Sequence, residues 1–496
     1  MLALSLRSPI FKSIDKFLRR VFCMSLMADL FRRVPSQADG LDLSDTPKHL
    51  GWIMLAALGI GATIGAGIFA MPGIIAGKAG PAGILSFVIT GIIILFVAIC
   101  YEKFSRLMPN GTSAYSYTYH SMGELIAWIV SFGLFMEYSF GASAVAIAWS
   151  VYLQTACKFK VDPFWAGPRM VNGHYEFGVN IIAIGVIIVI TAILIYGGVS
   201  KSAKLNLMLV ILKIALLVMF LAVGIPHVNP ANWQPFMPMG IQGVLQGAAV
   251  AVFPFVGFDA LYTFARESKS QKDTKLGTFI CIALVSLLYV TVMAVATGLA
   301  PCFIDGHKNE LFVGSEAAAP LAKLLASVGE DWTATFIAGG AVLGIFNVLL
   351  VLCMGGPRIF RNMAEDGLLP PLFTKVKNGS PTYGILLNGV LVAGFAGFME
   401  FGEIAHMMVL GTLVAFTFVC IGAMRLKAVS PLVAIPGLVG CVVLACNLEP
   451  TVLKAYAITC PLGLLIYFAY GYKHSKLNKK NVPISMAPEP ETKLEV

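Results

Sequence analysis

Long apolar runs separated by short polar segments dominate the pattern of this 496-residue chain. A helix rises about 1.5 Å per residue, so about 20 apolar residues cross a hydrocarbon core about 30 Å thick. Such runs predict twelve transmembrane helices, near residues 52–76, 82–101, 123–152, 179–197, 206–225, 241–264, 278–300, 335–356, 384–402, 404–424, 431–448 and 452–472. The predicted fold class is therefore an all-α integral membrane protein.

Two of these runs depart from the plain Leu, Ile and Val pattern in a matched way. The first run holds Gly59, Gly61, Gly65 and Gly67. The sixth holds Phe-Pro-Phe-Val-Gly at residues 253–257. Spans five apart cross the bilayer in opposite directions, which is typical of inverted repeats whose broken helices meet near the midplane. Close helix packing through small residues is the competing interpretation of the first run, and the matched break in the sixth favours a site.

A broken helix in a membrane must satisfy the backbone groups that the break exposes. N–H groups at a new helix start suit a carboxylate, and carbonyls at the ends of broken segments suit an ammonium. A zwitterionic amino acid offers both groups, so it is the predicted ligand. The predicted substrate-binding residues are Thr63, Ile64, Gly65, Ala66, Gly67, Phe253, Val256 and Asp259.

Composition and charge agree with a membrane location. The chain is 58% hydrophobic and 12% charged, far from the balance of a soluble domain. Its basic residues concentrate in the segments that are cytoplasmic if both termini lie inside, which is the positive-inside pattern. Topology and anionic lipid headgroups thus explain the net charge of +9, and no nucleic-acid partner is expected. Ten scattered cysteines predict neither a disulfide framework nor a zinc site.

The segment before Gly51 lacks a long apolar stretch followed by a cleavage site of small residues, so no signal peptide is expected. Met24 and Met27 precede an Ala-Asp-Leu-Phe-Arg-Arg run, which suggests that translation begins at one of them. Peptide mapping that recovers Met1 contradicts that hypothesis.

The residues around the breaks resemble a known family. Similar stretches include IGATIGAGIF, AGPAG, CYEKFSRLMPNGTSAYSYTYHSMGELIAW, FVGFDA and GGPRIFRNMAEDGLLP. They resemble amino acid permeases of the APC superfamily, in its cationic-amino-acid-transporter branch, from about Leu50 to Tyr472. The resemblance implies a secondary active transporter that imports L-amino acids and is no enzyme. Twelve-span members are mostly bacterial, so it also implies a bacterial inner membrane.

The resemblance also implies a domain organisation. Two inverted five-helix repeats, with broken helices 1 and 6, form a transporter core over residues 51–427, and two extra C-terminal helices lie in 428–472. Residues 1–50 are then a cytoplasmic N-terminal segment. Residues 473–496 lack apolar periodicity and are predicted to be a disordered cytoplasmic tail. A monomer is expected, with an amino acid and membrane lipids as its partners.

Charged residues within spans are costly there and are therefore candidates for function. Lys213, in the fifth span, is long enough to snorkel to the cytoplasmic interface. The resemblance implies instead that it matches the lysine that replaces a sodium ion in proton-coupled relatives. The middle of the eighth span, residues 344–348, lacks the adjacent hydroxyls of a sodium site. Proton coupling through Lys213 is predicted, with no cofactor and no need for sodium.

Two carboxylates lie deep in the predicted spans. Glu137 is about a dozen residues into the third span and is too short to reach the interface. The resemblance favours a role in the proton pathway or near the substrate, and a protonated packing residue is the alternative. Asp259 follows the break in the sixth span, where capping of freed N–H groups and gating both remain open.

Two further segments carry polar groups near the cytoplasmic side. Arg358 and Arg361, at the inner end of the eighth span, fit a solvated turn better than a cytoplasmic gate, which is the lesser option. Tyr115, Tyr117 and Tyr119 predict an interfacial aromatic belt, because tyrosine concentrates at that depth.

The substrate and the coupling mode stay open at this level. Ala66 stands where the family usually has a hydroxyl, Pro254 where a small residue is commoner, and Arg266-Glu267 departs from an acidic pair. Cationic amino acids and small or medium neutral ones are both compatible. Sodium-independent exchange is the nearest alternative function, and a passive channel is a distant one. A membrane-embedded enzyme is remote, because the seven histidines form no metal-ligand spacing.

Overall fold

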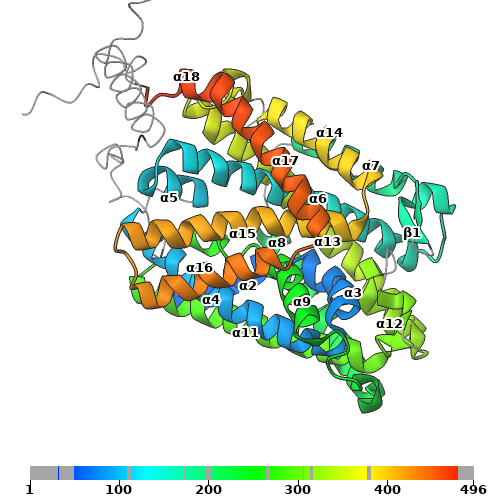
Figure 1. Cartoon of the computed structure of the whole chain (residues 1–496). Helices are drawn as coiled ribbons and strands as arrows, with labels where there is room; N and C mark the ends of the chain where they lie inside the picture. The colour runs from blue at the N-terminus through cyan, green and yellow to red at the C-terminus, as the bar shows by residue number, and fades with distance from the viewer. Residues whose placement is uncertain are drawn as a thin grey trace, which may run out of the picture.

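The computed structural model shows the chain as a bundle of helices (Figure 1). The described residues are 32, 50–108, 113–171, 174–196, 203–263, 268–304, 307–312, 317–376 and 381–478. The predictions on the start codon, on Arg266-Glu267 and on the tail beyond Asn478 lie outside this part of the chain.

Apolar helices account for the bulk of the described residues. Seven helical segments there are long and apolar enough to cross a membrane: Ala66–Leu107, Glu124–Ala156, Met208–His227, Gln271–Leu299, Asp331–Glu365, Phe401–Arg425 and Pro450–His474. Five shorter apolar helices accompany them: Trp52–Thr63, Ile181–Tyr196, Gly240–Phe255, Thr382–Phe398 and Pro431–Cys446. The apolar runs fold as helices because a chain in hydrocarbon must satisfy its backbone groups internally.

The order of the elements follows the order of the apolar runs. The first half holds α2 (Trp52–Thr63), α3 (Ala66–Ala79), α4 (Gly83–Leu107), α5 (Ala114–Ser121), α6 (Glu124–Ala156), α7 (Ile181–Tyr196) and α8 (Ala203–Gly224). The second half holds α9 (Gly240–Phe255), α10 (Ala260–Thr263), α11 (Gln271–Leu299), α12 (Pro320–Ser327), α13 (Asp331–Glu365), α14 (Thr382–Phe398) and α15 (Phe401–Arg425). α16 (Pro431–Cys446), α17 (Pro450–Ile466) and α18 (Tyr472–His474) follow, with a π-helical turn before α18.

Two groups of helices pack against each other. α3 packs on α9, and α11 packs on α2 and α4, so the elements that flank the breaks form one group. α6 packs on α13 and α15 and forms the centre of the other. The helices run from an end that carries α5 and α18 to an opposite end that carries β1 and α12 (Figure 1). We call these the α5 end and the β1 end.

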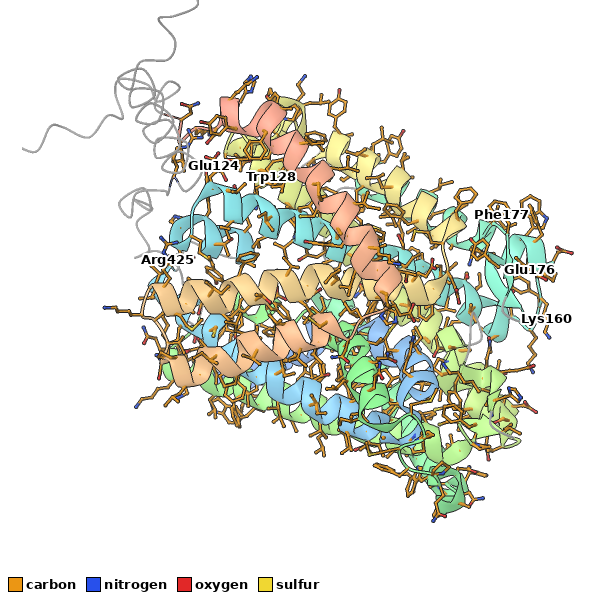
Figure 2. All side chains as sticks on the ribbon, in the orientation of Figure 1. Glu124, Trp128, Lys160, Glu176, Phe177 and Arg425 are labelled. Carbon is orange, nitrogen blue, oxygen red and sulfur yellow. The ribbon has the colours of Figure 1, made fainter. Side chains whose placement is uncertain are left out.

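Polar connections gather at the two ends. Two antiparallel hairpins lie in the described connections: β1 (Arg169–Val171) with β2 (His174–Glu176), and β3 (Phe303–Ile304) with β4 (His307–Lys308). Figure 2 shows Lys160 and Glu176 at the β1 end and Arg425 at the α5 end. The apolar middle between them is the part that fits a bilayer core.

The prediction of an aromatic belt was wrong for the three tyrosines near residue 117. They lie on α5, a helix separate from α6, and all three side chains are buried. The Tyr115 hydroxyl donates a hydrogen bond to the carboxylate of Asp366, which follows α13. The Tyr117 ring stacks on that of Phe104. These tyrosines therefore join helices inside the protein.

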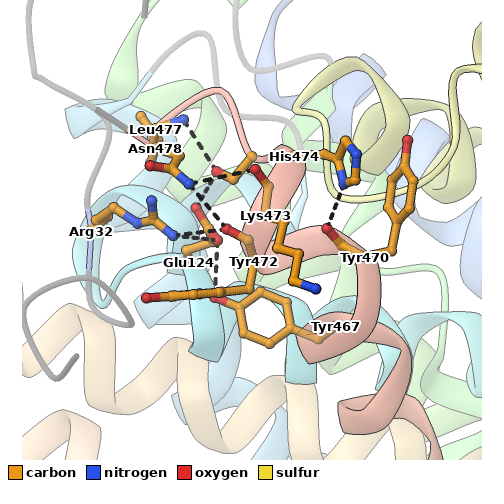
Figure 3. Close-up of polar contacts among 10 residues, drawn as sticks. Arg32, Glu124, Tyr467, Tyr470, Tyr472, Lys473, His474, Leu477 and Asn478 are labelled. Atoms are coloured by element: carbon orange, nitrogen blue, oxygen red, sulfur yellow. Dashed lines mark hydrogen bonds and ion pairs between the residues drawn. The ribbon is translucent and has the colours of Figure 1, made fainter. Parts of the chain in front are cut away.

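The C-terminal segment closes over the start of α6 (Figure 3). Glu124, the first residue of α6, is fully buried and accepts hydrogen bonds from the Tyr467 hydroxyl at 2.9 Å and from the Ser475 hydroxyl. The Arg32 guanidinium lies 3.5 Å from the same carboxylate. The ordered chain thus extends past residue 472, where the predicted tail begins.

An ion cluster ties the first broken helix to α15 at the β1 end. The Lys78 ammonium, at the end of α3, pairs with the carboxylate of Glu449, which directly precedes α17. The His406 imidazole of α15 lies 3.6 Å from the same carboxylate and is buried. We call Lys78, His406 and Glu449 the ion cluster.

An aromatic cluster makes the corresponding tie toward the α5 end. The ring of Tyr101, on α4, stacks on that of Tyr262 at 5.6 Å and meets that of Phe258 edge-on at 5.7 Å. The Phe258 ring lies 5.5 Å from that of Phe416 on α15. We call these four residues the aromatic cluster, and it joins the second break to α15.

Candidate functional site

The first break lies where the glycine pattern predicts it. α2 ends at Thr63, Ile64 and Gly65 leave the helical conformation, and α3 begins at Ala66. Gly65, which directly precedes α3, has no side chain with which to cap the start of that helix. The first N–H groups of a helix lack intrahelical partners and carry the positive end of its dipole, so this start is suited to a carboxylate.

The second break follows the same plan. α9 ends at Phe255, Val256 takes an extended conformation, and Gly257 has a φ of +107°. That φ is strained for residues with a side chain, so glycine is required there. Asp259 directly precedes α10 and is half-buried, in the position of a capping residue.

The two breaks meet in space. A Cβ atom added to Gly67 would lie 2.6 Å from the Cα of Pro254, so the backbones of α3 and α9 touch. A Cβ atom added to Gly257 would lie 2.6 Å from the Ala62 carbonyl oxygen in the last turn of α2. Beside Gly65 there is room, because an added Cβ atom would meet the nearest atoms, those of Val348, at 3.7 Å. The structure thus brings together the residues predicted from both runs.

A tyrosine that the sequence analysis missed joins the two breaks. The Tyr289 hydroxyl, on α11, lies 3.1 Å from the Thr63 carbonyl oxygen and 2.9 Å from that of Pro254. Its side chain is fully buried between the rings of Phe87 and Phe255. A tyrosine in the middle of an apolar span is unusual, since tyrosines concentrate at the interfaces and a buried hydroxyl seeks a partner. Its position in the middle of a span could therefore have marked Tyr289 as a candidate site residue.

Lys213 points toward the first break. Only 3% of its surface is exposed, and its ammonium lies 3.4 Å from the Gly61 carbonyl oxygen of α2. Its side chain packs against Gly344 of α13, where an added Cβ atom would lie 2.9 Å from the Lys213 Cγ. The lysine therefore connects α2 and α13 inside the protein and does not reach the cytoplasmic interface.

Glu137 is buried where α6 packs on α15. Its backbone nitrogen would lie 3.2 Å from a Cβ atom added to Gly411 of α15. The carboxylate oxygen Oε2 has no hydrogen-bond partner in the described part of the chain. The charge of Asp259 and a hydrogen bond with Thr412 affect this carboxyl group. Both midmembrane carboxylates therefore lie in one neighbourhood, beside the second break.

The two arginines of α13 lie near the end of that helix. The Arg361 guanidinium pairs with the Glu365 carboxylate one turn further along the same helix, at 2.7 Å, and the two side chains are 42% and 47% exposed. Arg358 is exposed as well. The geometry shows an intrahelical pair at a helix end for Arg361.

The chain matches known proteins over most of its length. The amino acid permease family model matches residues 50–469. A methylthioribose transporter of Bacillus subtilis (strain 168) is 36% identical over 474 residues, which cover 91% of this chain and 100% of that protein. The branched-chain amino acid permease BcaP of the same strain is 36% identical over 451 residues, covering 87% and 95%. The vacuolar cationic amino acid transporter 4 of Arabidopsis thaliana is 30% identical over 426 residues, covering 82% and 68%.

A bundle of apolar helices with two broken helices in contact defines a multi-pass membrane transport protein. The chain belongs to the amino acid permease family. The family and these relatives are transporters, so the predicted resemblance is confirmed and a membrane-embedded enzyme is excluded.

Proposed function

We propose that the chain imports small apolar L-amino acids across a bacterial cytoplasmic membrane by proton symport. The contact between the two breaks carries this proposal, because it places the start of α3, where Gly65 supplies no side-chain cap, beside the end of α9. A carboxylate at the N–H groups of Ala66 and Gly67 and an ammonium at the carbonyls of α9 match that arrangement.

The side chains around the cradle support an apolar substrate. Ile64 and Phe253 are buried, Val348 lies beside Gly65, and Val256 is half-buried at the second break. One relative, 95% of whose length is covered by the match, is named for branched-chain amino acids. Another is named for methylthioribose, whose hydroxyl groups also hydrogen-bond to backbone, so this sugar is the second candidate substrate.

The membrane arrangement belongs to the same proposal. The seven long and five shorter apolar helices support twelve spans in two inverted five-helix repeats with two extra helices, and the protein works as a monomer. The distribution of basic residues favours cytoplasmic termini. The α5 end then faces the cytoplasm and the β1 end faces outward.

Lys213 supports proton coupling without sodium. Its ammonium already contacts the Gly61 carbonyl, close to the first break, where a coupling cation would otherwise act. Loss of a proton would weaken that contact and loosen α2 from α13. Glu137, buried beside Asp259, is the proposed second proton carrier.

A thermal-shift screen of the purified protein identifies the substrate, because a ligand stabilises the folded state in proportion to ln(1 + [L]/Kd). The screen includes each of the twenty amino acids and methylthioribose. We expect leucine, isoleucine and valine to give the largest shifts. Shifts from methylthioribose alone would replace the amino acid proposal, and shifts from lysine or arginine would contradict the apolar substrate.

Uptake into liposomes with an imposed pH gradient, acidic outside, tests the coupling. We expect accumulation that a proton ionophore abolishes. Lys213→Ala should lose it, whereas Lys454→Ala, which removes an exposed lysine from α17, should keep it. Undiminished accumulation by Lys213→Ala contradicts the role of Lys213, and counterflow without net uptake favours exchange.

A further inference from the structure

The Tyr289 hydroxyl faces two carbonyls that belong to the last turns of the two broken helices. Thr63 is the last residue of α2, and Pro254 lies in the last turn of α9. Carbonyls in the last turn of a helix have no intrahelical partner. Leaving such a group unsatisfied in a buried place costs about 1–3 kcal/mol. One side chain from a third helix, α11, serves both of them.

A phenol hydroxyl has one proton, so it donates to one of these carbonyls at a time. The contacts of 3.1 and 2.9 Å allow it to pass its hydrogen bond from Thr63 to Pro254 by rotating the hydroxyl alone. The ring itself is held by Phe87 and Phe255, with centroids 5.6 and 5.2 Å away. The ring is therefore fixed in place, and its hydroxyl can donate to the carbonyl of either helix.

We infer that Tyr289 is a positioning residue for the substrate cradle. Its hydroxyl lies within hydrogen-bond distance of the end of α2 and of the end of α9 and donates to one or the other, so it sets the spacing between the two broken helices. The inference rests on the proposed function, since this spacing affects transport only if the two breaks bind the substrate. Tyr289 acts through the backbone and need not touch the substrate.

Tyr289→Phe tests the inference, with Tyr152→Phe as the matched control. The Tyr152 hydroxyl is also fully buried and also donates to a carbonyl of a broken helix, that of Phe69 at 2.6 Å, but this carbonyl lies in the first turn of α3 and not at the end of a helix. Both variants lose the same atom from the same kind of environment. They differ in whether the lost bond joins the two breaks.

The readouts are leucine affinity by thermal shift and the KM and maximal rate of leucine uptake. Tyr289→Phe should weaken the affinity about tenfold and raise KM by a similar factor, because the two break carbonyls lose the one donor that they share. Tyr152→Phe should stay within about twofold of the wild type. Equal effects of the two variants overturn the inference. A wild type that leucine does not stabilise contradicts the proposed function itself, so the two failures are distinguishable.

Tyr289→p-aminophenylalanine keeps the test decisive if the Phe variant fails to fold. Its amine donates two N–H groups, so it can serve both carbonyls at once. We expect folding and leucine affinity at least equal to those of the wild type. A folded amine variant whose leucine affinity falls about tenfold or more would contradict positioning by a hydrogen-bond donor.

Discussion

The two ends of the bundle tie the broken helices to α15 by different chemistry. At the β1 end, the ion cluster joins α3 to α15 through the partly exposed side chains of Lys78 and Glu449 and the buried imidazole of His406. Toward the α5 end, the aromatic cluster joins the second break to α15 through buried rings. Burial of apolar area does not depend on protonation, whereas an ion pair does. The comparison indicates that pH acts on the ion cluster and not on the aromatic cluster.

Glu449 shows why the β1 end responds to pH. Burial disfavours its charged form, but the hydrogen bond from Lys78, together with the electrostatic effects of His406, Lys78 and Lys308, outweighs burial and holds the pKa of Glu449 below its usual value. At the α5 end, burial raises the pKa of Asp366 despite the hydrogen bond from Tyr115, and that carboxyl lies outside the aromatic cluster. Four predictions test this contrast, in order of decreasing effect.

Removing the ring of Tyr101 should produce the largest change. Tyr101→Ala deletes a fully buried aromatic side chain that contacts Phe258 and Tyr262, and such truncations cost about 3–5 kcal/mol of unfolding free energy. Thermal melting in detergent should show a large loss of similar size at pH 5 and pH 8. A loss that grows or shrinks strongly with pH would contradict the apolar nature of this tie.

Neutralising Glu449 should have a smaller effect. Glu449→Gln removes the ion pair with Lys78, whose partners are 20% and 36% exposed, so solvent screening limits the loss to about 1 kcal/mol at neutral pH. Lys78→Met should cost a similar amount, and the double variant should cost little more than either. Additive losses in that double-mutant cycle would show that the two side chains do not interact.

The contribution of Glu449 should depend on pH with a definite sign. Because its folded pKa lies below the ordinary value of 4.5, the stabilisation is fully present above that value and is lost as the pH falls through the folded pKa. The difference in melting temperature between wild type and Glu449→Gln should therefore be constant from pH 8 to about pH 5 and should vanish at lower pH. A difference that increases with acidity would reverse the sign and refute this account.

Removing only the hydroxyl of Tyr101 should have almost no effect. This oxygen is buried without a hydrogen-bond partner among the described residues, so Tyr101→Phe deletes a polar atom that gains nothing from its surroundings. We expect stability within about 0.5 kcal/mol of the wild type, or slightly above it. A loss approaching that of Tyr101→Ala would reveal a bond at this hydroxyl and would make this tie partly polar.

Local signals in the sequence predicted the breaks, whereas the partners of the buried side chains depend on contacts between residues far apart in the chain. Glycine and proline mark a backbone conformation directly, so Gly65, Gly67, Pro254 and Gly257 could be placed before any fold was known. The partners of Tyr289 lie 226 and 35 residues away along the chain. No pattern within one span says which neighbouring helix its side chains will face.

The tyrosines of α5 show the limit of depth-based interpretation. Their distance from an apolar run predicted a lipid interface, but the chain between α4 and α6 folds as a helix at one end of the bundle, where the Tyr115 hydroxyl bonds to Asp366. The direction of Lys213 was undetermined for a related reason, because a lysine of that length reaches either the interface or the Gly61 carbonyl.

The buried carboxylate of Glu124 has a consequence for how the protein is made. Its partner Tyr467 lies 343 residues later in the chain, so at roughly 5–20 residues per second a ribosome needs roughly 20–70 s to supply it. Until then, Arg32, which precedes Glu124 in the chain, can pair with this carboxylate, but the hydroxyl donors Tyr467 and Ser475 that bond to it in the folded protein are still missing. The last membrane helix therefore completes the hydrogen bonding of a carboxylate that entered the membrane with one of the first helices.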